Sequence, residues 1–249
     1  MKTLLTLLAS LLFVTGYGQV INIDGEVTSS TIANQISDSL NKNWINVKQF
    51  GAVGDSLTND SLAVVNAIAY ANSLNIGVWF PSGVYTIGKI TLPANMELSG
   101  NAKINFKSGR TGDMLTLGHK NIISGLWFEG GNRTAGPSPV GTRTAIRIRQ
   151  KKDVIIQNCR IYGFSKYGIE IDSVGYTTYS KGVQINECDI QYNFYGLYLP
   201  ALTEYTNIGN STFQYNRYGI YNLGGSNKIN GCIINTNFVG LYIGNGNNE

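Results

Sequence analysis

Charged residues are scarce in this chain of 249 residues, because Asp, Glu, Lys and Arg together make up only 14 % of it. Low charge excludes the helical-bundle class, and together with 30 Gly and 15 Tyr it is typical of short strands joined by tight turns. The net charge of +4 is too small to indicate a nucleic-acid partner. We therefore expect a turn-rich β protein that does not bind nucleic acid.

Cysteine and histidine are rarer still. The three cysteines, Cys159, Cys188 and Cys232, are an odd number, which excludes a fully paired disulfide framework. The repeat described below places them at equivalent positions, so we expect buried core thiols, with Cys159 and Cys188 close enough to be bridged. The single histidine, His119, falls in the turn LGHKN, and we expect a surface residue and not a catalytic acid or base.

Long apolar runs are absent beyond the amino terminus. An apolar run, Leu4–Val14, follows Lys2, and small residues precede Gln19. This pattern predicts a signal peptide over residues 1–18, and the run is too short to span a bilayer. The alternative is a buried helix. We expect a secreted or cell-envelope protein that has no membrane contact after cleavage, with a polar leader over residues 19–43.

Two short phrases recur along the second half of the chain. The first contains Gly or Ala followed by Ile or Leu, and it reads AIRIR at 145–149, GIEID at 168–172, GLYLP at 196–200, GIYNL at 219–223 and GLYIG at 240–244, with a weaker copy, MLTLG, at 114–118. The second lies between these copies and reads ISGLWF at 123–128, IQNCRI at 156–161, INECDI at 185–190, IGNSTF at 208–213 and INGCII at 229–234. Both alternate apolar and polar residues, so each phrase predicts one short strand.

The common step of the two phrases, 21 to 31 residues, predicts a solenoid. No leucine-rich pattern with a helical segment is present, and Asn- and Gly-rich turns join the phrases, so we predict a parallel β-helix with one unit per coil. Equivalent residues then stack in ladders about 4.8 Å apart. The ladders expected are a small inward column, an Asn turn ladder, and a Gly column that needs either an unusual backbone conformation or a close approach. The first contains Leu126, Cys159, Cys188, Ser211 and Cys232, and the second Asn193, Asn216 and Asn237.

Residues 45–100 follow a different pattern. Asp60 is suited to cap a helix that continues through Val64 and Ile68 and ends near residues 75–77. Short strands follow in VWF, VYTIG and ITL. A helix before the first coil would cover the open end of the stack, where unpaired strand edges are otherwise an aggregation risk.

The run VKQFGAVGDSLTND, followed by this helix, VWFPSGVYTIG and ITLPANMELSG, resembles the amino-terminal part of the pectate lyase superfamily, V-x-D-F-G-A-x-G-D-G-x-T-D-D, helix, F-P-x-G-x-Y. The resemblance implies an all-β fold, a right-handed parallel β-helix solenoid with an N-terminal capping α-helix, over residues 44–249. It also implies kinship with secreted polysaccharide lyases, polygalacturonase-like hydrolases and phage tailspikes. Ser56 and Asn59 depart from the pattern, and the polygalacturonase-type site motifs are missing.

The end of the sequence, GLYIGNGNNE, directly follows a predicted strand and contains no capping element. Terminal repeats normally differ from interior ones because they cover the exposed core. We therefore expect either a homo-oligomer that seals this end or a C-terminally truncated domain.

One face of the predicted helix carries the candidate site. Two long insertions, at 129–144 and 172–182, are expected to form walls at opposite ends of one sheet. The floor between them would hold the candidate catalytic residues Arg147, Arg149, Glu170 and Asp172. Two carboxylates suit a glycoside hydrolase, whereas a base with an arginine or a cation suits a lyase. No metal ligands are identified, and Ca²⁺ is expected only in the lyase interpretation.

Aromatic residues continue the same face. Tyr198, Tyr221 and Tyr242 are predicted to bind substrate by presenting flat apolar surface to sugar rings, and Arg143 by binding a uronic-acid carboxylate. The structural alternative is that the arginines and carboxylates form ordinary cross-strand ion pairs and that the tyrosines only stack on an exposed sheet.

Two function classes remain open. The first is an exported β-helix protein that binds an acidic, uronic-acid-containing polysaccharide and cleaves it as a lyase or glycoside hydrolase. The second is a non-catalytic surface adhesin, tailspike-like fibre or structural β-helix. The insertions and the Arg, Glu and Tyr floor favour the first, and the missing motifs favour the second.

Overall fold

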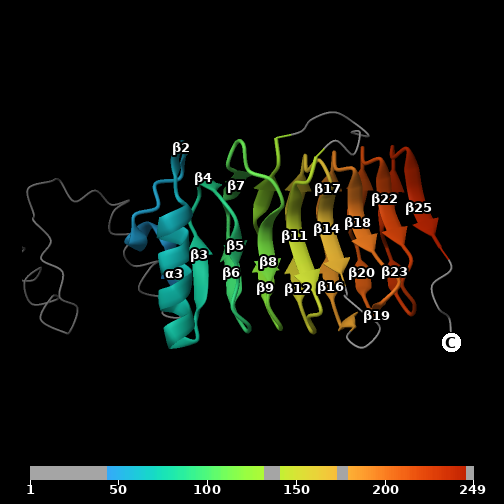
Figure 1. Cartoon of the computed structure of the whole chain (residues 1–249), viewed down its shortest axis with the longest axis horizontal. Helices are drawn as coiled ribbons and strands as arrows, with labels where there is room; N and C mark the ends of the chain where they lie inside the picture. Colours follow the sequence, from blue (N-terminus) through green and yellow to red (C-terminus); the bar gives the residue numbers. More distant parts are fainter. Residues whose placement is uncertain (1–43, 132–140, 173–178, 245–249) are drawn as a thin grey trace, which may run out of the picture. The chain divides into compact units, whose positions relative to one another are not determined.

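The computed structural model describes residues 44–131, 141–172 and 179–244. Over these residues the chain winds through three parallel sheets, and neighbouring strands of each sheet come from successive coils (Figure 1). The predicted parallel β-helix is therefore confirmed. The expected signal peptide (1–18) and polar leader (19–43) lie outside the described residues. Among the residues that are described, no helix is long and apolar enough to cross a membrane.

The three sheets are named A, B and C in the order in which the chain passes through them. Sheet A contains β1 (Trp44–Asn46), β3 (Gly77–Phe80), β6 (Glu97–Gly100), β9 (Ile122–Ser124), β12 (Ile155–Gln157), β16 (Gln184–Asn186), β20 (Asn207–Gly209) and β23 (Lys228–Asn230). Sheet B contains β2 (Asp55–Asn59), β4 (Val84–Ile87), β7 (Lys103–Phe106), β10 (Trp127–Glu129), β13 (Arg160–Tyr162), β17 (Asp189–Gln191), β21 (Thr212–Gln214) and β24 (Ile233–Asn235). Sheet C contains β5 (Ile90–Thr91), β8 (Asp113–Leu117), β11 (Thr144–Arg149), β14 (Tyr167–Asp172), β18 (Tyr195–Leu199), β22 (Tyr218–Asn222) and β25 (Val239–Ile243). A small pair, β15 (Ser180–Lys181) and β19 (Thr203–Glu204), completes the strands.

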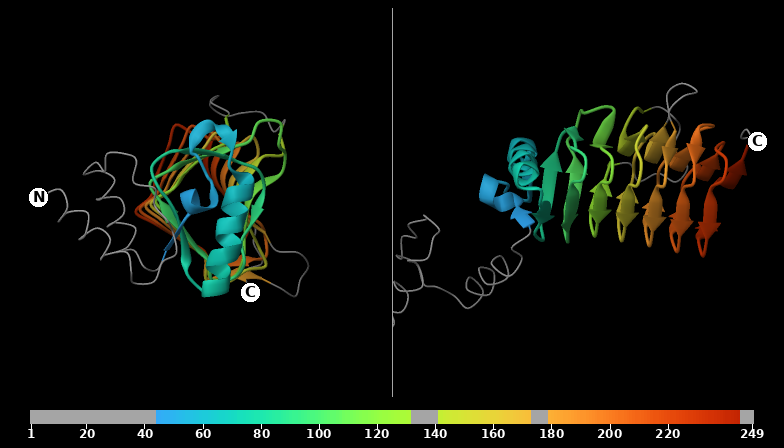
Figure 2. Two further views of the ribbon diagram at one scale, coloured as in Figure 1. Left: turned by 90° about the vertical axis from the view of Figure 1, so that its left-hand side faces the viewer. Right: turned by 90° about the horizontal axis from the view of Figure 1, so that it is seen from below.

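A helix covers the amino-terminal end of the stack, as predicted. After the 3₁₀ turn η1 (Val47–Phe50), helix α3 (Ser61–Leu74) packs against η1, β1 and β3 and lies across the end of the coils (Figure 2). It ends at Asn75, whose left-handed conformation stops the helix.

Asp60 is the N-cap residue of this helix, as predicted, but its side chain does not bond to the first turn. Its side chain makes no cap hydrogen bond, and its buried carboxylate instead accepts from the backbone N–H groups of Val53 (2.7 Å) and Gly54 (3.3 Å). The carboxylate bonds to this loop and not to the first turn of the helix, because the two loop amides have no other described partner. Asp60 thus ties the preceding loop to the start of α3.

The second recurring phrase contains two strands and not the single strand expected. In INECDI, for example, β16 ends at Asn186 and β17 begins at Asp189, and Glu187 between them has a φ of 54°. A left-handed residue turns the chain sharply, so each such phrase forms the bend between sheets A and B. The period of two is interrupted at the bend, because the buried residues Ile185, Cys188 and Ile190 are three and then two positions apart. The single-strand prediction overlooked this extra residue.

The predicted ladders stack inside the coils. Gly196 needs no unusual φ, but a Cβ there would lie 2.5 Å from the carbonyl oxygen of Gly219 in the next coil, so close approach is the reason for glycine. In the Asn ladder, the Asn216 carboxamide oxygen accepts from the backbone N–H (2.9 Å) and the side-chain amide (3.1 Å) of Asn193. Asn237 repeats both contacts toward Asn216.

The cysteines are core residues, as expected. Cys159 and Cys188 are buried, Cys232 is partly buried and packs against the core, and all three are free thiols. On the last coil, in contrast, large apolar side chains are exposed, among them Phe238 (72 %) and Ile243 (67 %). That a second subunit or further coils cover these side chains stays a prediction.

Candidate functional site

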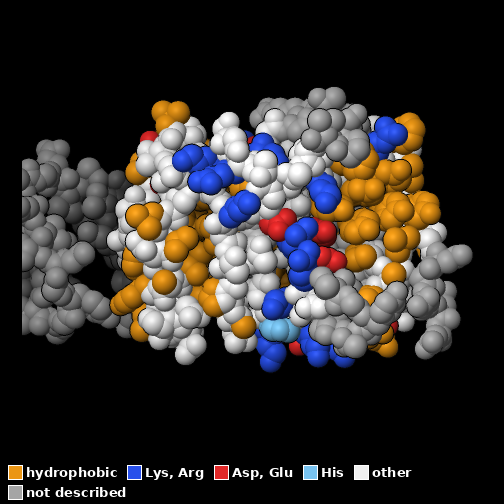
Figure 3. Space-filling view, in the orientation of Figure 1, with side chains coloured by type: hydrophobic (Ala, Val, Ile, Leu, Met, Phe, Trp, Pro, Cys, Tyr) orange, Lys and Arg blue, Asp and Glu red, His pale blue; other side chains and the backbone are white. Residues whose placement is uncertain are grey.

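The outer face of sheet C has the register that the sequence predicted. One column of outward side chains runs through six successive strands in the order Thr116, Arg147, Glu170, Tyr198, Tyr221 and Tyr242. Figure 3 shows cationic and anionic side chains meeting in the middle of this face, with hydrophobic side chains gathered beside them. The face therefore divides into a charged half and an aromatic half that adjoin.

The charged half is an ion-pair cluster built across three strands. The Arg147 Nε donates to the Glu170 Oε2 (2.7 Å), and a second guanidinium nitrogen contacts the same oxygen. The third nitrogen of Arg147 lies 3.1 Å from the Asp113 carboxylate on β8. Arg147 thus joins β8, β11 and β14.

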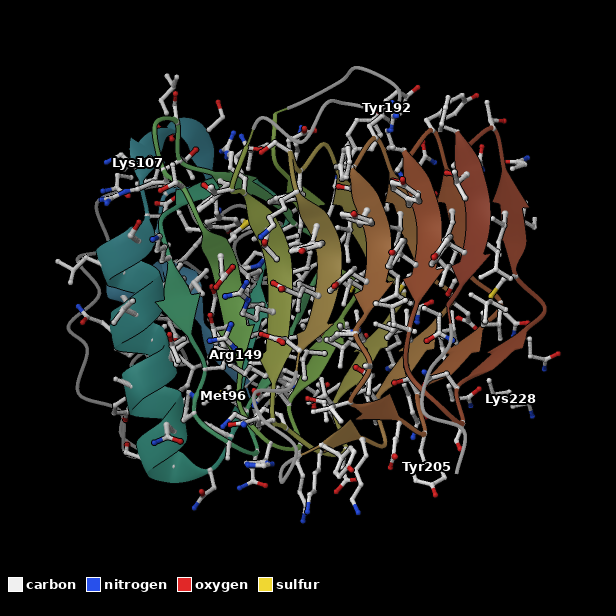
Figure 4. All side chains as sticks on the ribbon, turned by 45° about the vertical axis from the view of Figure 1, so that its right-hand side comes forward. Met96, Lys107, Arg149, Tyr192, Tyr205 and Lys228 are labelled. Atoms are coloured by element: carbon white, nitrogen blue, oxygen red, sulfur yellow. The ribbon has the colours of Figure 1, made fainter. Side chains whose placement is uncertain are left out.

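Arg149 forms the second pair of the cluster. Its Nε donates to the Asp172 Oδ2 (2.8 Å), and a terminal nitrogen lies 2.7 Å from that oxygen. The Arg149 side chain is 45 % exposed, whereas the Glu170 side chain is only 7 % exposed. Figure 4 labels Arg149 on the outer side of the ribbon. Both ion pairs of the structural interpretation are thus present, and the catalytic roles of these four residues stay predictions.

Burial controls the protonation of Glu170. Desolvation raises its pKa above the ordinary glutamate value, although the hydrogen bond and charge of Arg147 lower it and the Asp172 charge raises it further. Burial by itself would lower the pKa of Arg147, but its contacts with Glu170 raise it. Within this ion pair, burial thus raises the pKa of Glu170 and Glu170 raises the pKa of Arg147.

Asp113 was missed in the sequence analysis. It directly precedes the weak repeat MLTLG, and only the register of β8 with β11 places it within reach of Arg147. With Asp113, the ion-pair cluster consists of Asp113, Arg147, Arg149, Glu170 and Asp172. Three carboxylates then face two guanidinium groups, whereas the predicted floor had two of each.

The aromatic half contains a second column that was also missed. Tyr167, Tyr195 and Tyr218 pair in register beside the predicted column, and together the two form a tyrosine array of Tyr167, Tyr195, Tyr198, Tyr218, Tyr221 and Tyr242. Burial raises the pKa of Tyr167, and the Glu170 charge adds to this effect. The array therefore begins against the ion-pair cluster.

The tyrosine rings stack on one another, which changes what they offer a ligand. The rings of Tyr198 and Tyr221 are 5.5 Å apart with planes at 20°, and those of Tyr221 and Tyr242 are 4.4 Å apart at 6°. Parallel rings this close overlap face to face, because coplanar rings would collide. Tyr221 thus has both faces covered and presents an edge and a hydroxyl, not the flat surface expected for it.

Arg143 is engaged elsewhere. Its guanidinium donates to the carbonyl oxygens of Phe106 (2.9 Å) and Gly130, and it lies 4.9 Å from the Phe106 ring. Burial lowers its pKa, although the charge of Glu129 raises it. These contacts assign Arg143 a structural role in joining coils, and its expected role in binding a ligand gains no support.

Other expected features of the site have mixed outcomes. His119 is exposed, as predicted, and its Nδ1 accepts from the Lys152 amide (3.2 Å). The expected walls at 129–144 and 172–182 fall largely on residues outside the described part of the chain, so the cleft stays a prediction. Among the described residues, no group of three or more His, Cys, Asp or Glu side chains is arranged to hold a metal ion.

Comparison with known proteins identifies related sequences and folds. A family model described as rhamnogalacturonase A/epimerase, pectate lyase-like matches residues 44–222. The preneck appendage protein of Bacillus phage PZA is 29 % identical over 158 residues, a match that covers 57 % of this chain and 18 % of the phage protein. The chain thus spans less than a fifth of that relative.

Solved structures share the fold at low identity. A putative glycosyl hydrolase from Parabacteroides merdae is 12 % identical with a TM-score of 0.64, over 77 % of this chain and 97 % of that one. The tailspike gp49 of Acinetobacter baumannii bacteriophage Fri1, a capsular polysaccharide depolymerase, is 13 % identical with a TM-score of 0.58, over 70 % of this chain and 35 % of that one. At these identities the likeness concerns the fold alone.

Proposed function

Because the chain belongs to the rhamnogalacturonase A/epimerase, pectate lyase-like family, we propose that it binds a polysaccharide along the outer face of sheet C. One observation carries the proposal. Glu170 pairs in register with Tyr198, so the ion-pair cluster and the tyrosine array form one continuous polar and aromatic surface. A polymer of similar units suits such a surface, because the coils repeat equivalent side chains at regular steps.

Each half of this surface has its own part in binding. Carboxylate oxygens of the ion-pair cluster accept hydrogen bonds from sugar hydroxyls. Tyrosine edges and hydroxyls add apolar contact and further hydrogen bonds. Arg149 is the guanidinium best placed for a uronic-acid carboxylate, because it is 45 % exposed and contacts one oxygen of Asp172.

Cleavage of the bound chain is a second candidate function, and the raised pKa of Glu170 favours it. A protonated carboxyl can act as the general acid of glycoside hydrolysis, and Asp172 on the same strand would be the second carboxylate. In the lyase alternative, an arginine would neutralise the uronate while a base removes a proton, and Ca²⁺ would be the expected cofactor. A non-catalytic adhesin or tailspike-like role needs the binding surface alone.

The site of action proposed is outside the cell or on its surface. The similarity to a phage preneck appendage protein and to a phage tailspike supports this location. The predicted signal peptide agrees with it.

Glycan binding by the full chain tests the main proposal. A panel of neutral and acidic polysaccharides is screened against the wild type, the Tyr198→Ala/Tyr221→Ala variant and the control Tyr205→Ala, whose tyrosine is 61 % exposed and outside the array. We expect the double variant to lose at least tenfold in affinity and the control to keep it. Equal binding by all three proteins would contradict the proposal.

Cleavage is measured in the same panel by following reducing ends and the ultraviolet absorbance of unsaturated products. Glu170→Gln and Asp172→Asn should abolish the signal of an enzyme while retaining binding, and the product type separates hydrolase from lyase. Binding with no product in any substrate would assign a non-catalytic role.

A further inference from the structure

A hollow of about 500 Å³ lies at the bend between sheets A and B, with no contribution from sheet C. Its lining includes Asn101, Lys103, Gly125, Trp127, Asn158 and Arg160. Neither the candidate site nor the proposed function uses these residues.

A glycine of the bend, Gly125, lines the hollow. Gly125 occupies the left-handed bend position (φ 71°), and a Cβ there would collide with the carbonyl oxygen of Gly100 in the preceding coil. The equivalent residue of the next coil, Asn158, has the same left-handed conformation and an exposed side chain. Gly125 lines the hollow together with Asn101 of the preceding coil and Asn158 of the next.

The floor of the hollow is cationic and aromatic. Lys103, Trp127 and Arg160 stand in register on three successive strands of sheet B. The Lys103 Nζ lies 4.5 Å from the centre of the Trp127 ring, and the Arg160 guanidinium lies 5.7 Å from it. No carboxylate is among the lining residues, although Glu129 pairs with Lys103 at 3.2 Å.

Arg160 is the cation available to a ligand. It is exposed, and it makes no ion pair with any residue that the structure describes. Its register neighbour Asp189 accepts a hydrogen bond from the Gln191 amide (2.6 Å). This differs from the ion-pair cluster on sheet C, where both guanidinium groups already contact carboxylates.

We propose that this hollow is a second saccharide site, which binds an anionic sugar residue through its carboxylate or sulfate group. The fork of Arg160 holds the anion, with Lys103 adding positive charge. The side-chain amides of Asn101 and Asn158 bond to sugar hydroxyls, and Trp127 supplies apolar contact. That the anion is carried on a saccharide rests on the proposed function, whereas the preference for an anion rests on the hollow alone.

Calorimetric titration of the full chain tests the site with three probes: an oligogalacturonate, a sulfated oligosaccharide and a neutral cello-oligosaccharide. We expect an anionic probe to bind and the neutral one to bind at least tenfold more weakly. Arg160→Gln should reduce the affinity for the anionic probe about tenfold or more, because a charged hydrogen bond is lost. The matched control is Arg217→Gln, which removes another arginine beside an aromatic ring, 4.3 Å from Phe238.

The outcomes separate the sources of the anion and the two sites. Binding of the galacturonate assigns a carboxylate, and binding of the sulfated probe alone assigns a sulfate. Equal affinity for the neutral probe, equal loss in both arginine variants, or no binding of either anion would overturn the proposal.

Fluorescence locates the bound probe. The chain has three tryptophans, so Trp44→Phe/Trp79→Phe leaves Trp127 as the only one. The anionic probe should change its emission, and the change should persist in Tyr198→Ala/Tyr221→Ala, which impairs only the sheet C surface. If that variant loses the change, the hollow is not a separate site. If the change persists while sheet C variants bind polysaccharide normally, the proposed function fails and the hollow stands.

Discussion

At the scale of single residues, Glu170 is the side chain whose surroundings have most consequence for chemistry. Its side chain is 7 % exposed, contacts Arg147 through one oxygen, and faces Tyr167 and Tyr198 of the array. Desolvation and the ion pair act in opposite directions on its pKa, and desolvation is the larger effect. The folded protein therefore favours the protonated carboxyl more than the unfolded chain does.

This difference predicts how stability depends on pH. A carboxyl whose pKa is raised by folding binds more protons in the folded state, so its contribution is most favourable below the ordinary glutamate pKa of about 4.3 and is lost as pH rises through the raised value. We expect wild-type stability relative to Glu170→Gln to fall as pH rises through this window. Urea unfolding of both proteins at several acidic pH values measures this difference in the free energy of unfolding. If the wild type instead became more stable relative to the variant as pH rises, the contact with Arg147 would outweigh burial.

Other single residues changed roles between sequence and structure. Asp60 binds the amides of the loop just before it, and Arg143 binds the carbonyl oxygens of Phe106 in the preceding coil and of Gly130 in its own coil. The contact with Phe106 depends on the winding of the chain, and the conformation of the loop decides the contact of Asp60.

At the scale of elements, the turn that leads into sheet C fixes the packing of successive coils. Its asparagine bonds to the next asparagine, and its glycine lets the backbone of the next coil approach. These two residues explain why Asn and Gly recur three positions apart, in QYNFYG at 191–196 and QYNRYG at 214–219. The recurrence of this Asn and this Gly is a requirement of stacking.

Gly196 and Gly240 provide a matched test of this turn. A Cβ at Gly196 would lie 2.5 Å from a backbone oxygen, whereas at Gly240 it would meet only the Ile234 side chain, at 3.3 Å. We expect Gly196→Ala to reduce the free energy of unfolding by about 1–3 kcal/mol or more, as overpacking does. Gly240→Ala should cost clearly less in the same denaturant titration, and equal losses would show that close approach is not the reason for glycine.

At the scale of the whole coil stack, stability comes from neighbouring coils. Each coil buries its apolar side chains against the coils before and after it, so an interior strand has two neighbours. Strand β18 lies between β14 and β22, whereas β25 pairs only with β22 among the described strands. The exposed apolar residues of the last coil are the direct result.

Hydrogen exchange should show that the last coil is less protected than an interior coil. The amides of Tyr195 and Val239 occupy equivalent positions, and each donates a 2.8 Å hydrogen bond to the preceding coil. Since the hydrogen bonds match, a difference in protection reports the stacking of coils. We expect the Val239 amide to exchange at least about tenfold faster. Equal protection in a dilute sample would show that the last coil is covered in solution.

The sequence by itself determined the solenoid, its register and the side chains of the sheet C face. Stacked coils demand like residues at like positions, so the Leu, Ile, Asn and Gly ladders had to appear as repeats, and alignment of the repeats placed Arg147 beside Glu170. The capping helix was also predictable, because its N-cap residue Asp60 and the apolar residues that follow are local signals.

Only the tertiary structure decided what the aligned side chains do. It brought Asp113 to Arg147, covered the faces of Tyr221 with neighbouring rings, and opened a hollow at Gly125 beside Arg160. Each depends on side-chain rotamers and on the bends between sheets. The buried residues of such a bend are spaced three and then two positions apart, so the shift in spacing was present in the sequence, but only the structure shows that the chain turns there.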